Sequence, residues 1–182
     1  MITLEPQERI HLLKRRHQIV LRLRIFPLIS LLILLLLLFF FFLFHKISWP
    51  KFFVEHFPQP STLKLNFIFA FLFSLTLPAF WCLIFFEITK YYLTYWIITN
   101  QRIIEAKLIG LFNVQYSSIE LDKIQDMTAK IKGLLPSIYH FGDLRIQTAA
   151  EKGEFLLDQI EDPELVKQVI FEAKIDYQKT KT

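Results

Sequence analysis

The chain has 182 residues, enough for one or two structural units, and 53% of them are hydrophobic. A mean hydropathy of +0.38 is too high for an ordinary soluble domain, so the composition indicates a membrane protein. The formal net charge is +4, yet residues 87–182 carry twelve Lys and Arg against fourteen Asp and Glu. This balance excludes a basic nucleic-acid-binding domain, and the single cysteine, Cys82, excludes an intramolecular disulfide and a cysteine-cluster metal site.

The first element is a basic arm, residues 1–24, in which six Lys and Arg outnumber two Glu. Leucines and isoleucines are mixed with these charges, so the arm can form a helix at the lipid headgroups or extend the apolar segment that follows. Each basic residue near an anionic leaflet gains about 1 kcal/mol of attraction. We expect a topology signal, with a specific lipid or partner site as the alternative. The residues expected at the membrane surface are Lys14, Arg15, Arg16, Arg22 and Arg24.

Two apolar segments are predicted to cross the membrane. Residues 25–44 carry no charge, and at about 1.5 Å per residue a helix of this length matches the ~30 Å hydrocarbon core. Residues 65–86 are equally uncharged, with Pro78 as a kink. A cleaved signal peptide competes for the first segment, but the apolar run is longer than the usual ~7–15 residues and no small-x-small site follows. The aromatic and proline-rich residues 45–64 are expected to form an external loop.

Basic residues flanking the two segments predict their orientation. The arm carries six Lys and Arg, whereas residues 45–64 carry three, so the arm should remain in the cytoplasm. Two spans return the chain to the same side. We therefore expect a multi-pass protein of the cytoplasmic (inner) membrane with both termini cytoplasmic. Neither segment contains an ionisable Asp, Glu, Lys, Arg or His, which argues against a proton or ion pathway.

Alternating residues after Phe86 predict β-structure. Residues 91–98 form a candidate first strand and RIIEAKLI, residues 102–109, a second, with Thr99–Arg102 as the turn between them. IITNQRII can also be the frayed end of the second span, but the strands that follow favour the hairpin. Gly110 tolerates positive φ and suits the next turn.

The third strand, residues 112–121, should turn alternate side chains inward. These are Phe112, Val114 and Tyr116. Strand character continues from Ile124, where a slip in the spacing marks a bulge. Gly133 and Pro136 are typical of a loop.

A final hairpin is predicted from residue 143 onward. DLRIQTA should bury Leu144 and Ile146, and a turn at Glu151–Gly153 leads to the strand GEFLLDQI. The count of antiparallel strands is then six or seven.

The last element is a helix. Asp162, Pro163 and Glu164 combine an N-cap residue, a proline at the first helical position and an acid in the first turn. One apolar stripe should pack on the sheets. It consists of Leu165, Val166, Val169, Ile170, Ala173 and Tyr177. Residues 178–182 form a polar tail.

In this order the elements resemble the bacterial PH-like, or membrane-flanked, domain family, which occurs on proteins with two N-terminal spans. The resemblance covers roughly residues 88–175. It is carried by TYWIITNQRII (94–104), Gly110, IELDKIQDM (119–127), FGDLRIQTA (141–149) and the final helix. It implies a membrane-anchored α+β protein whose PH-like domain, residues 88–177, has two nearly orthogonal antiparallel sheets capped by the C-terminal helix. It implies no enzymatic activity.

Candidate contact residues follow from this resemblance. Phosphoinositide-binding PH domains place several basic residues around the first hairpin, where this chain offers Arg102 and, further along, Lys107. These two are the expected headgroup or partner contacts. One arginine in the turn weakens the case for phosphoinositide binding.

Residues for catalysis or for a cofactor are not evident. The five histidines are scattered without metal-ligand spacing, His140 beside Asp143 has no nucleophile motif, and four glycines leave no phosphate-binding loop. We expect no catalytic residue, metal, cofactor, nucleic acid or small-molecule substrate. The acids of residues 151–164 should form a solvated face and a helix cap, with a partner-binding patch as the alternative.

These features together predict a non-enzymatic integral membrane protein. It would present a PH-like domain at the cytoplasmic membrane face and bind a protein segment or lipid headgroups, for instance by adding a strand to an open sheet edge. Its partners would be the lipid bilayer and a protein, or a second copy of the chain. The alternative is an accessory or regulatory subunit of a membrane transport or envelope-assembly complex.

Overall fold

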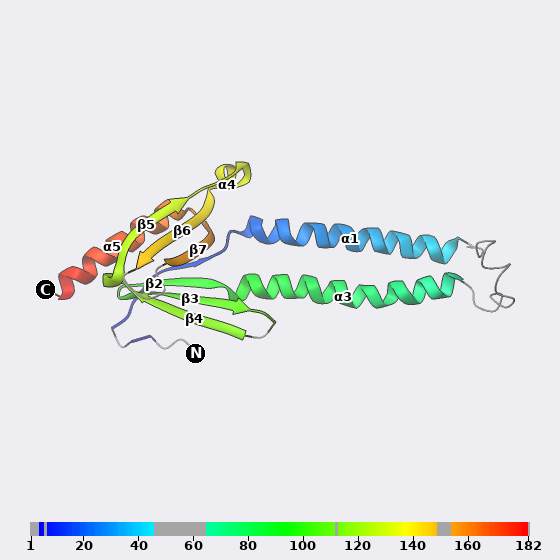
Figure 1. Ribbon diagram of the computed structural model, residues 1–182, viewed down its shortest axis with the longest axis horizontal. Coiled ribbons are helices and arrows are strands. Elements are labelled where there is room, and N and C mark those ends of the chain that lie inside the picture. The colour runs from blue at the N-terminus through cyan, green and yellow to red at the C-terminus, as the bar shows by residue number, and fades with distance from the viewer. Residues whose placement is uncertain (1–3, 6, 46–64, 112, 149–153, 182) are drawn as a thin grey trace. The chain divides into compact units, whose positions relative to one another are not determined.

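The computed structural model describes residues 4–5, 7–45, 65–111, 113–148 and 154–181 (Figure 1). The chain divides into two compact units. One comprises residues 22–87 and is built from apolar helices. The other joins residues 1–21 to residues 88–182 and forms a β domain.

The apolar segments form two long helices, α1 (Gln18–Phe44) and α3 (Leu65–Leu93). Both are long and apolar enough to cross a membrane, by length and composition. Arg24 of α1 and Glu87 of α3 form an ion pair, with Nη1 and Oε2 3.5 Å apart. The predicted loop at residues 45–64 lies, apart from His45, outside the described residues.

Helix α3 continues to Leu93, so the predicted strand at residues 91–98 is wrong over its first part. The segment from Glu87 to Leu93 contains no glycine or proline, and its apolar residues fit both the ~3.6-residue period of a helix and the two-residue period of a strand. Intrahelical hydrogen bonding therefore continues until Thr94, and the strand β2 is short (Tyr95–Thr99).

The β domain contains two antiparallel sheets. The four-stranded sheet has the order β1-β2-β3-β4 and the three-stranded sheet the order β5-β6-β7 (Figure 1). The remaining strands are β1 (Ile10–Arg15), β3 (Arg102–Ile109), β4 (Asn113–Glu120), β5 (Ile124–Lys130), β6 (Phe141–Thr148) and β7 (Glu154–Glu161). A 3-10 turn, η2 (Leu121–Lys123), joins the sheets. The predicted α+β architecture is confirmed.

Strand β1 corrects the prediction of a helical arm for residues 10–15, whereas residues 18–24 extend the first apolar helix, as the alternative predicted. Strand β1 pairs antiparallel with β2, with Leu13 opposite Ile97 and Arg15 opposite Tyr95. Arg16 adds a bridge to Ile160 of β7. The β domain therefore begins before the first apolar helix, whereas the sequence placed its start at residue 88. Pairing with β2 satisfies the backbone groups that a headgroup-level helix would have satisfied internally.

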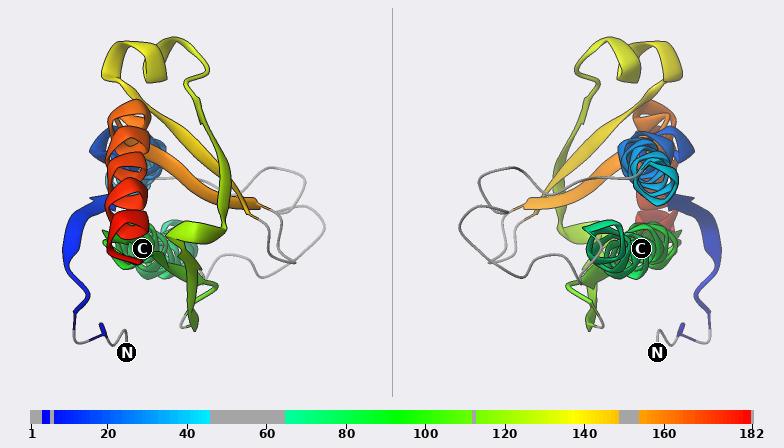
Figure 2. Two further views of the ribbon diagram at one scale, coloured as in Figure 1. Left: turned by 90° about the vertical axis from the view of Figure 1, so that its left-hand side faces the viewer. Right: turned by 90° about the vertical axis from the view of Figure 1, so that its right-hand side faces the viewer.

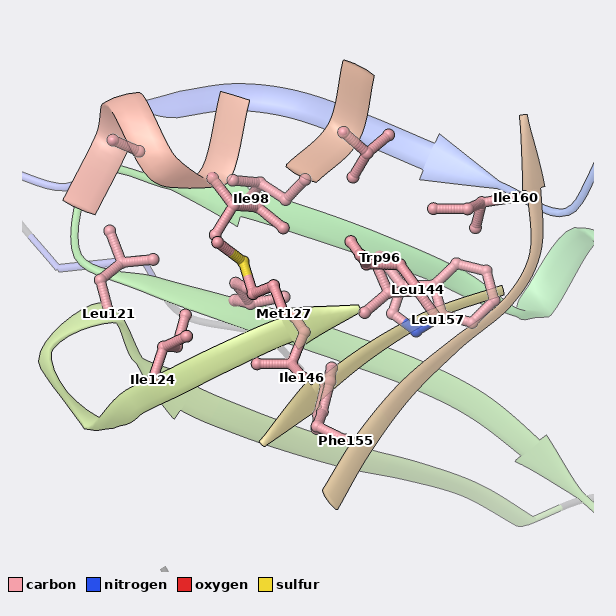
Figure 3. Packing of buried hydrophobic residues seen from close by; sticks show 14 residues of the cluster. Trp96, Ile98, Leu121, Ile124, Met127, Leu144, Ile146, Phe155, Leu157 and Ile160 are labelled. Atoms are coloured by element: carbon pink, nitrogen blue, oxygen red, sulfur yellow. The ribbon is translucent and has the colours of Figure 1, made fainter. Parts of the chain in front are cut away.

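The core lies between the two sheets and helix α5 (Pro163–Lys181). Trp96, Leu144 and Leu157 are fully buried there (Figure 3). Val166 and Ile170 close the core from α5, which confirms the predicted stripe at these positions. Figure 2 shows α5 lying alongside the sheets, where it contacts β5, β6 and β1.

Other predictions divide between confirmation and correction. The bulge in β5 is confirmed by a register shift between Ile124 and Asp126, and β6 pairs with β7 as predicted. Tyr116 is exposed rather than inward. Helix α5 runs to Lys181, so most of the predicted polar tail is helical. Phe112 and the turn at residues 151–153 lie outside the described residues.

The predicted loop around Pro136 contains a short helix, α4 (Leu134–Tyr139). Pro136 is its third residue, where a helix does not need the proline N–H. The helix ends at His140, which adopts a left-handed conformation with φ 53°. Helix α4 projects from the end of the three-stranded sheet (Figure 2), and none of its residues is buried.

Candidate functional site

Arg102, the predicted contact residue, is paired inside the β domain. Its Nε and Nη2 each donate to the carboxylate of Glu8 at 2.9 Å. The Glu8 side chain is 0% exposed and that of Arg102 24%. Hydrogen bonding from Arg102 lowers the pKa of Glu8 to about 2 against the opposing effect of burial, and Glu8 raises the pKa of Arg102. The guanidinium is therefore committed to an internal partner.

The N-terminal segment also covers the rest of this turn. The Arg9 N–H donates to Asn100 Oδ1 at 2.8 Å, and the Asn100 N–H donates to the Arg9 carbonyl at 3.1 Å. The Thr99 hydroxyl lies 2.8 Å from Glu8 Oε1. We call Glu8, Thr99 and Arg102 the N-terminal clamp. It fastens residues before β1 to the β2–β3 turn and engages the arginine of that turn.

Lys107 does not join Arg102 in one site. The two are five residues apart on β3, about 16 Å at ~3.3 Å per residue, and they lie on opposite faces of the strand. Lys107 shares its face with Glu105, whose pKa is raised by burial and lowered by the Lys107 ammonium. Trp96 Nε1 donates to Glu105 Oε1 at 3.3 Å. The charge of Lys107 thus acts on an internal carboxylate.

The basic arm is matched by acids of β7. Arg16 Nε donates to Asp158 Oδ1 at 3.2 Å and its Nη2 makes a second short bond to the same carboxylate. Lys14 Nζ lies 3.5 Å from Glu161 Oε2. The Arg15 guanidinium lies 5.7 Å from the centre of the Tyr92 ring. Three of the five predicted surface residues therefore make their contacts within the β domain. Arg24 pairs with Glu87, and Arg22 is exposed on α1.

A groove with both polar and apolar walls lies between β5 and α5. Its volume is about 940 Å³. The apolar surface comes from Met127, Ala129 and Phe171, and the Phe171 side chain remains 56% exposed. The lining residues are Asp126, Met127, Thr128, Ala129, Glu164, Lys167, Gln168, Phe171 and Glu172. We call this the β5–α5 groove.

One wall of the β5–α5 groove is a sheet edge. Strand β5 ends the order β5-β6-β7, and no described residue pairs with its outer side as a strand. Lys174 Nζ donates to the Ile124 carbonyl at 2.6 Å and covers the start of this edge. From residue 125 to residue 130, alternate N–H and C=O groups of an edge strand point away from the sheet. They are available for pairing.

The β5–α5 groove is acidic. Its lining contains three carboxylates and one ammonium, so its formal charge is −2. These groups belong to Asp126, Glu164, Glu172 and Lys167. A phosphate or other anionic headgroup would be repelled there. Cationic or neutral polypeptide segments would not be repelled.

A second hollow, of about 300 Å³, lies over β5 and β6 and is lined mostly by polar residues. Its arginine, Arg145, pairs with Glu154 at 3.2 Å. Among the described residues no group of three or more His, Cys, Asp and Glu could hold a metal ion. The sequence signal that could have found the β5–α5 groove is Phe171, a large aromatic on α5 outside the apolar stripe.

Comparison with known proteins identifies one sequence family. The model of a family described as bacterial PH domain matches residues 18–174, which include both long helices but not β1. A search of curated proteins found no match. Among solved structures, the chain is similar to a DUF1696 family protein with a pleckstrin-homology domain from Shewanella loihica. The identity is 16%, the TM-score 0.37, and the match covers 44% of this chain and 70% of that one.

Proposed function

The chain belongs to the bacterial PH domain family, and from this premise we propose that it is a non-enzymatic, membrane-anchored binding module. Its ligand is an extended protein segment that adds a strand to the edge of β5 in the β5–α5 groove. The observation that carries the proposal is the coincidence of the β5 edge, with which no described strand pairs, and a hollow of about 940 Å³.

Strand addition fits the physical properties of this edge. Backbone hydrogen bonds to an edge strand supply affinity without regard to sequence, and adjacent pockets select alternate side chains of the ligand. The groove volume falls in the range of ~300–1,000 Å³ that is usual for ligand sites. Residues 125–130 offer about 20 Å of edge at ~3.3 Å per residue. A segment of about six residues would fill it.

The lining residues indicate the chemistry of the ligand. Met127, Ala129 and Phe171 would contact an apolar side chain, whose burial contributes about 1.5–3 kcal/mol. Glu164 and Glu172 would pair with a lysine or arginine on the same segment. An anionic lipid headgroup is disfavoured by the same carboxylates. A protein ligand is therefore preferred to a lipid ligand at this groove.

The helices support the membrane part of the proposal. Strand β1 ends at Arg15 and α1 begins at Gln18, while α3 ends at Leu93 and β2 begins at Tyr95. Linkers this short would hold the β domain at the bilayer surface if α1 and α3 span it. The six basic residues of the arm favour the cytoplasmic side for the domain and for both termini. The ligand would then be cytoplasmic or part of another membrane protein.

The test uses the full chain in lipid nanodiscs and a displayed library of random ten-residue peptides. Selected peptides should bind with at least about tenfold preference for basic and apolar sequences over acidic ones, as expected for charge complementarity. Hydrogen exchange should show new protection at residues 125–130. Phe171→Ala should weaken binding by about fivefold or more.

Leu165→Ala is the matched control, because Leu165 lies on the same helix, is 46% exposed and does not line the groove. It should change the affinity by less than about twofold. New protection confined to β4 would contradict the proposal. Equal losses in the two variants would contradict it as well.

A further inference from the structure

Several exposed apolar side chains lie at one end of the β domain. This end, which we call the helix end, is defined by His17, which precedes α1, and by Tyr95, which begins β2 two residues after the end of α3. Tyr95 pairs with Ala106, and β3 continues past Ala106 to Ile109, so the β3–β4 turn lies at the helix end. Leu111 in this turn is 64% exposed.

Helix α4 belongs to the same end. His140 separates it from Phe141, whose ring stacks on that of His17 with the centroids 5.3 Å apart. The His140 carbonyl accepts a hydrogen bond from the Asp162 N–H at 2.8 Å. These contacts place α4 beside the residue that precedes α1.

Helix α4 exposes an unusual amount of apolar surface. Leu134 is 84% exposed, and Leu135, Ile138 and Tyr139 are also exposed. Four of the six residues of the helix are therefore large apolar groups in contact with solvent. Clustered exposed groups of this kind mark interaction surfaces.

The charged side chains within the two exposed segments themselves are lysines. Residues 127–142 contain Lys130 and Lys132 and no Asp or Glu, and residues 106–119 contain Lys107 and no Asp or Glu. Asp and Glu are absent from both stretches, although residues 87–182 as a whole carry more acids than bases. Apolar groups flanked by lysines, with a tyrosine among them, are the composition of segments that lie at the lipid interface.

We propose that α4 and the β3–β4 turn insert their apolar side chains into the lipid interface and fix the orientation of the β domain on the bilayer. The occupant of this surface is the membrane itself, since both candidate spans leave the domain at the helix end. The proposal rests on the membrane anchoring given above but does not depend on a ligand in the β5–α5 groove. In this orientation α4 and the turn form a second membrane contact besides the two spans.

The test places a fluorescent NBD label at single cysteines in the full chain with Cys82→Ser. Labels at Leu134→Cys and Leu111→Cys report on the helix end. A label at Ile175→Cys, which is exposed on α5 far from Asp162, is the aqueous control, and one at Leu37→Cys in α1 reports on the span. The proteins are reconstituted into vesicles of phosphatidylcholine and phosphatidylglycerol that contain lipids spin-labelled near the headgroup or near the chain end.

The labels at residues 134 and 111 should be quenched about twofold or more by the shallow spin label, and that at residue 175 should not. Leu134→Asp with Ile138→Asp should reduce the shallow quenching at residue 111 by about half, because the two contacts share one orientation. Replacing phosphatidylglycerol by phosphatidylcholine should also reduce the shallow quenching at residue 111. Both side chains are exposed, so these substitutions leave the core intact.

Two results would overturn the insertion while leaving the anchoring intact. One is deep quenching at residue 37 with none at residues 134 and 111, which would show that the helix end stands away from the bilayer. The other is blue-shifted but unquenched emission at residue 134, which would show that a protein or a second copy covers α4. Absence of quenching at residue 37 would overturn both the anchoring and the insertion.

Discussion

Replacing Glu8 with glutamine removes one negative charge from the N-terminal clamp and keeps the volume of the side chain. The carboxylate of Glu8 accepts two hydrogen bonds from Arg102 at 2.9 Å and one from the Glu5 N–H at 3.0 Å. The Glu8 side chain is wholly buried. The variant leaves the Arg102 guanidinium without its counter-charge and so should destabilise the β domain.

The magnitude follows from the pKa of Glu8. A decrease from 4.5 to about 2 corresponds to roughly 3.4 kcal/mol at about 1.4 kcal/mol per pKa unit. Arg102 remains 24% exposed, and solvent screening reduces this value. We expect Glu8→Gln to lower the free energy of unfolding by about 2–3 kcal/mol at neutral pH, below the ~3–5 kcal/mol of a fully buried broken pair.

The effect should depend on pH in a defined direction. The pKa of Glu8 is lower in the folded than in the unfolded state, so its stabilisation is complete above about pH 5 and is lost as the pH falls towards 2. Protonated Glu8 then resembles glutamine. The difference in unfolding free energy between the wild type and Glu8→Gln should be constant from neutral pH to about pH 5 and approach zero near about pH 2.

Urea unfolding of the full chain in detergent micelles measures this difference. The fluorescence of buried Trp96 reports on the β domain once Trp49→Phe and Trp81→Phe remove the other two tryptophans. Glu5→Gln is the control, because Glu5 is exposed and its hydrogen bonds with Glu8 are made by its backbone. A loss below about 0.5 kcal/mol at neutral pH would refute the reasoning, as would a larger loss that does not change with pH.

Other parts of the structure lead to three further predictions. A fragment of residues 88–182 lacks β1 and should give a poorly dispersed amide NMR spectrum, whereas a dispersed one would show that β1 is dispensable. Arg16→Lys keeps the charge but cannot make two hydrogen bonds to the Asp158 carboxylate. Chemical unfolding should therefore show that the free energy of unfolding falls by about 1–2 kcal/mol, and no decrease would mean that a single hydrogen bond suffices. Gly142→Ala would place a Cβ 2.5 Å from the Lys130 carbonyl oxygen, so thermal unfolding should shift down by the equivalent of about 2 kcal/mol, and an unshifted midpoint would rule out this close approach.

The sequence determined those features that depend on local composition. Uncharged apolar runs require a water-free surrounding wherever they lie, so α1 and α3 were predictable from residues 25–44 and 65–86 alone. The start of α5 was equally local, because Pro163 and Glu164 suit the first turn of any helix. Strands β3 and β6 were predictable because one face of each is regularly apolar. The family resemblance follows from the order of these elements.

Only the tertiary structure decided the role of the basic arm. Residues 10–15 can be a helix or a strand, and the choice depends on a β2 edge that lies about eighty residues later in the chain. The sequence signal for this contact was the match between the positive arm and the acids of residues 154–161. Charge alone, however, determines neither that the arm forms a strand nor its pairing register. The pairing of Arg102 was hidden for the same reason, since its partner Glu8 is distant in sequence.

The β5–α5 groove and the helix end likewise exist only after folding. The groove joins residues 126–129 to residues 164–172, and its open edge depends on which strands pair. Leu134 and Leu111 are more than twenty residues apart, and only the stacking of His17 on Phe141 and the register of β3 bring their segments to one end. Local sequence determines which side chains are apolar or charged, whereas the packing of distant segments determines which of them remain exposed together.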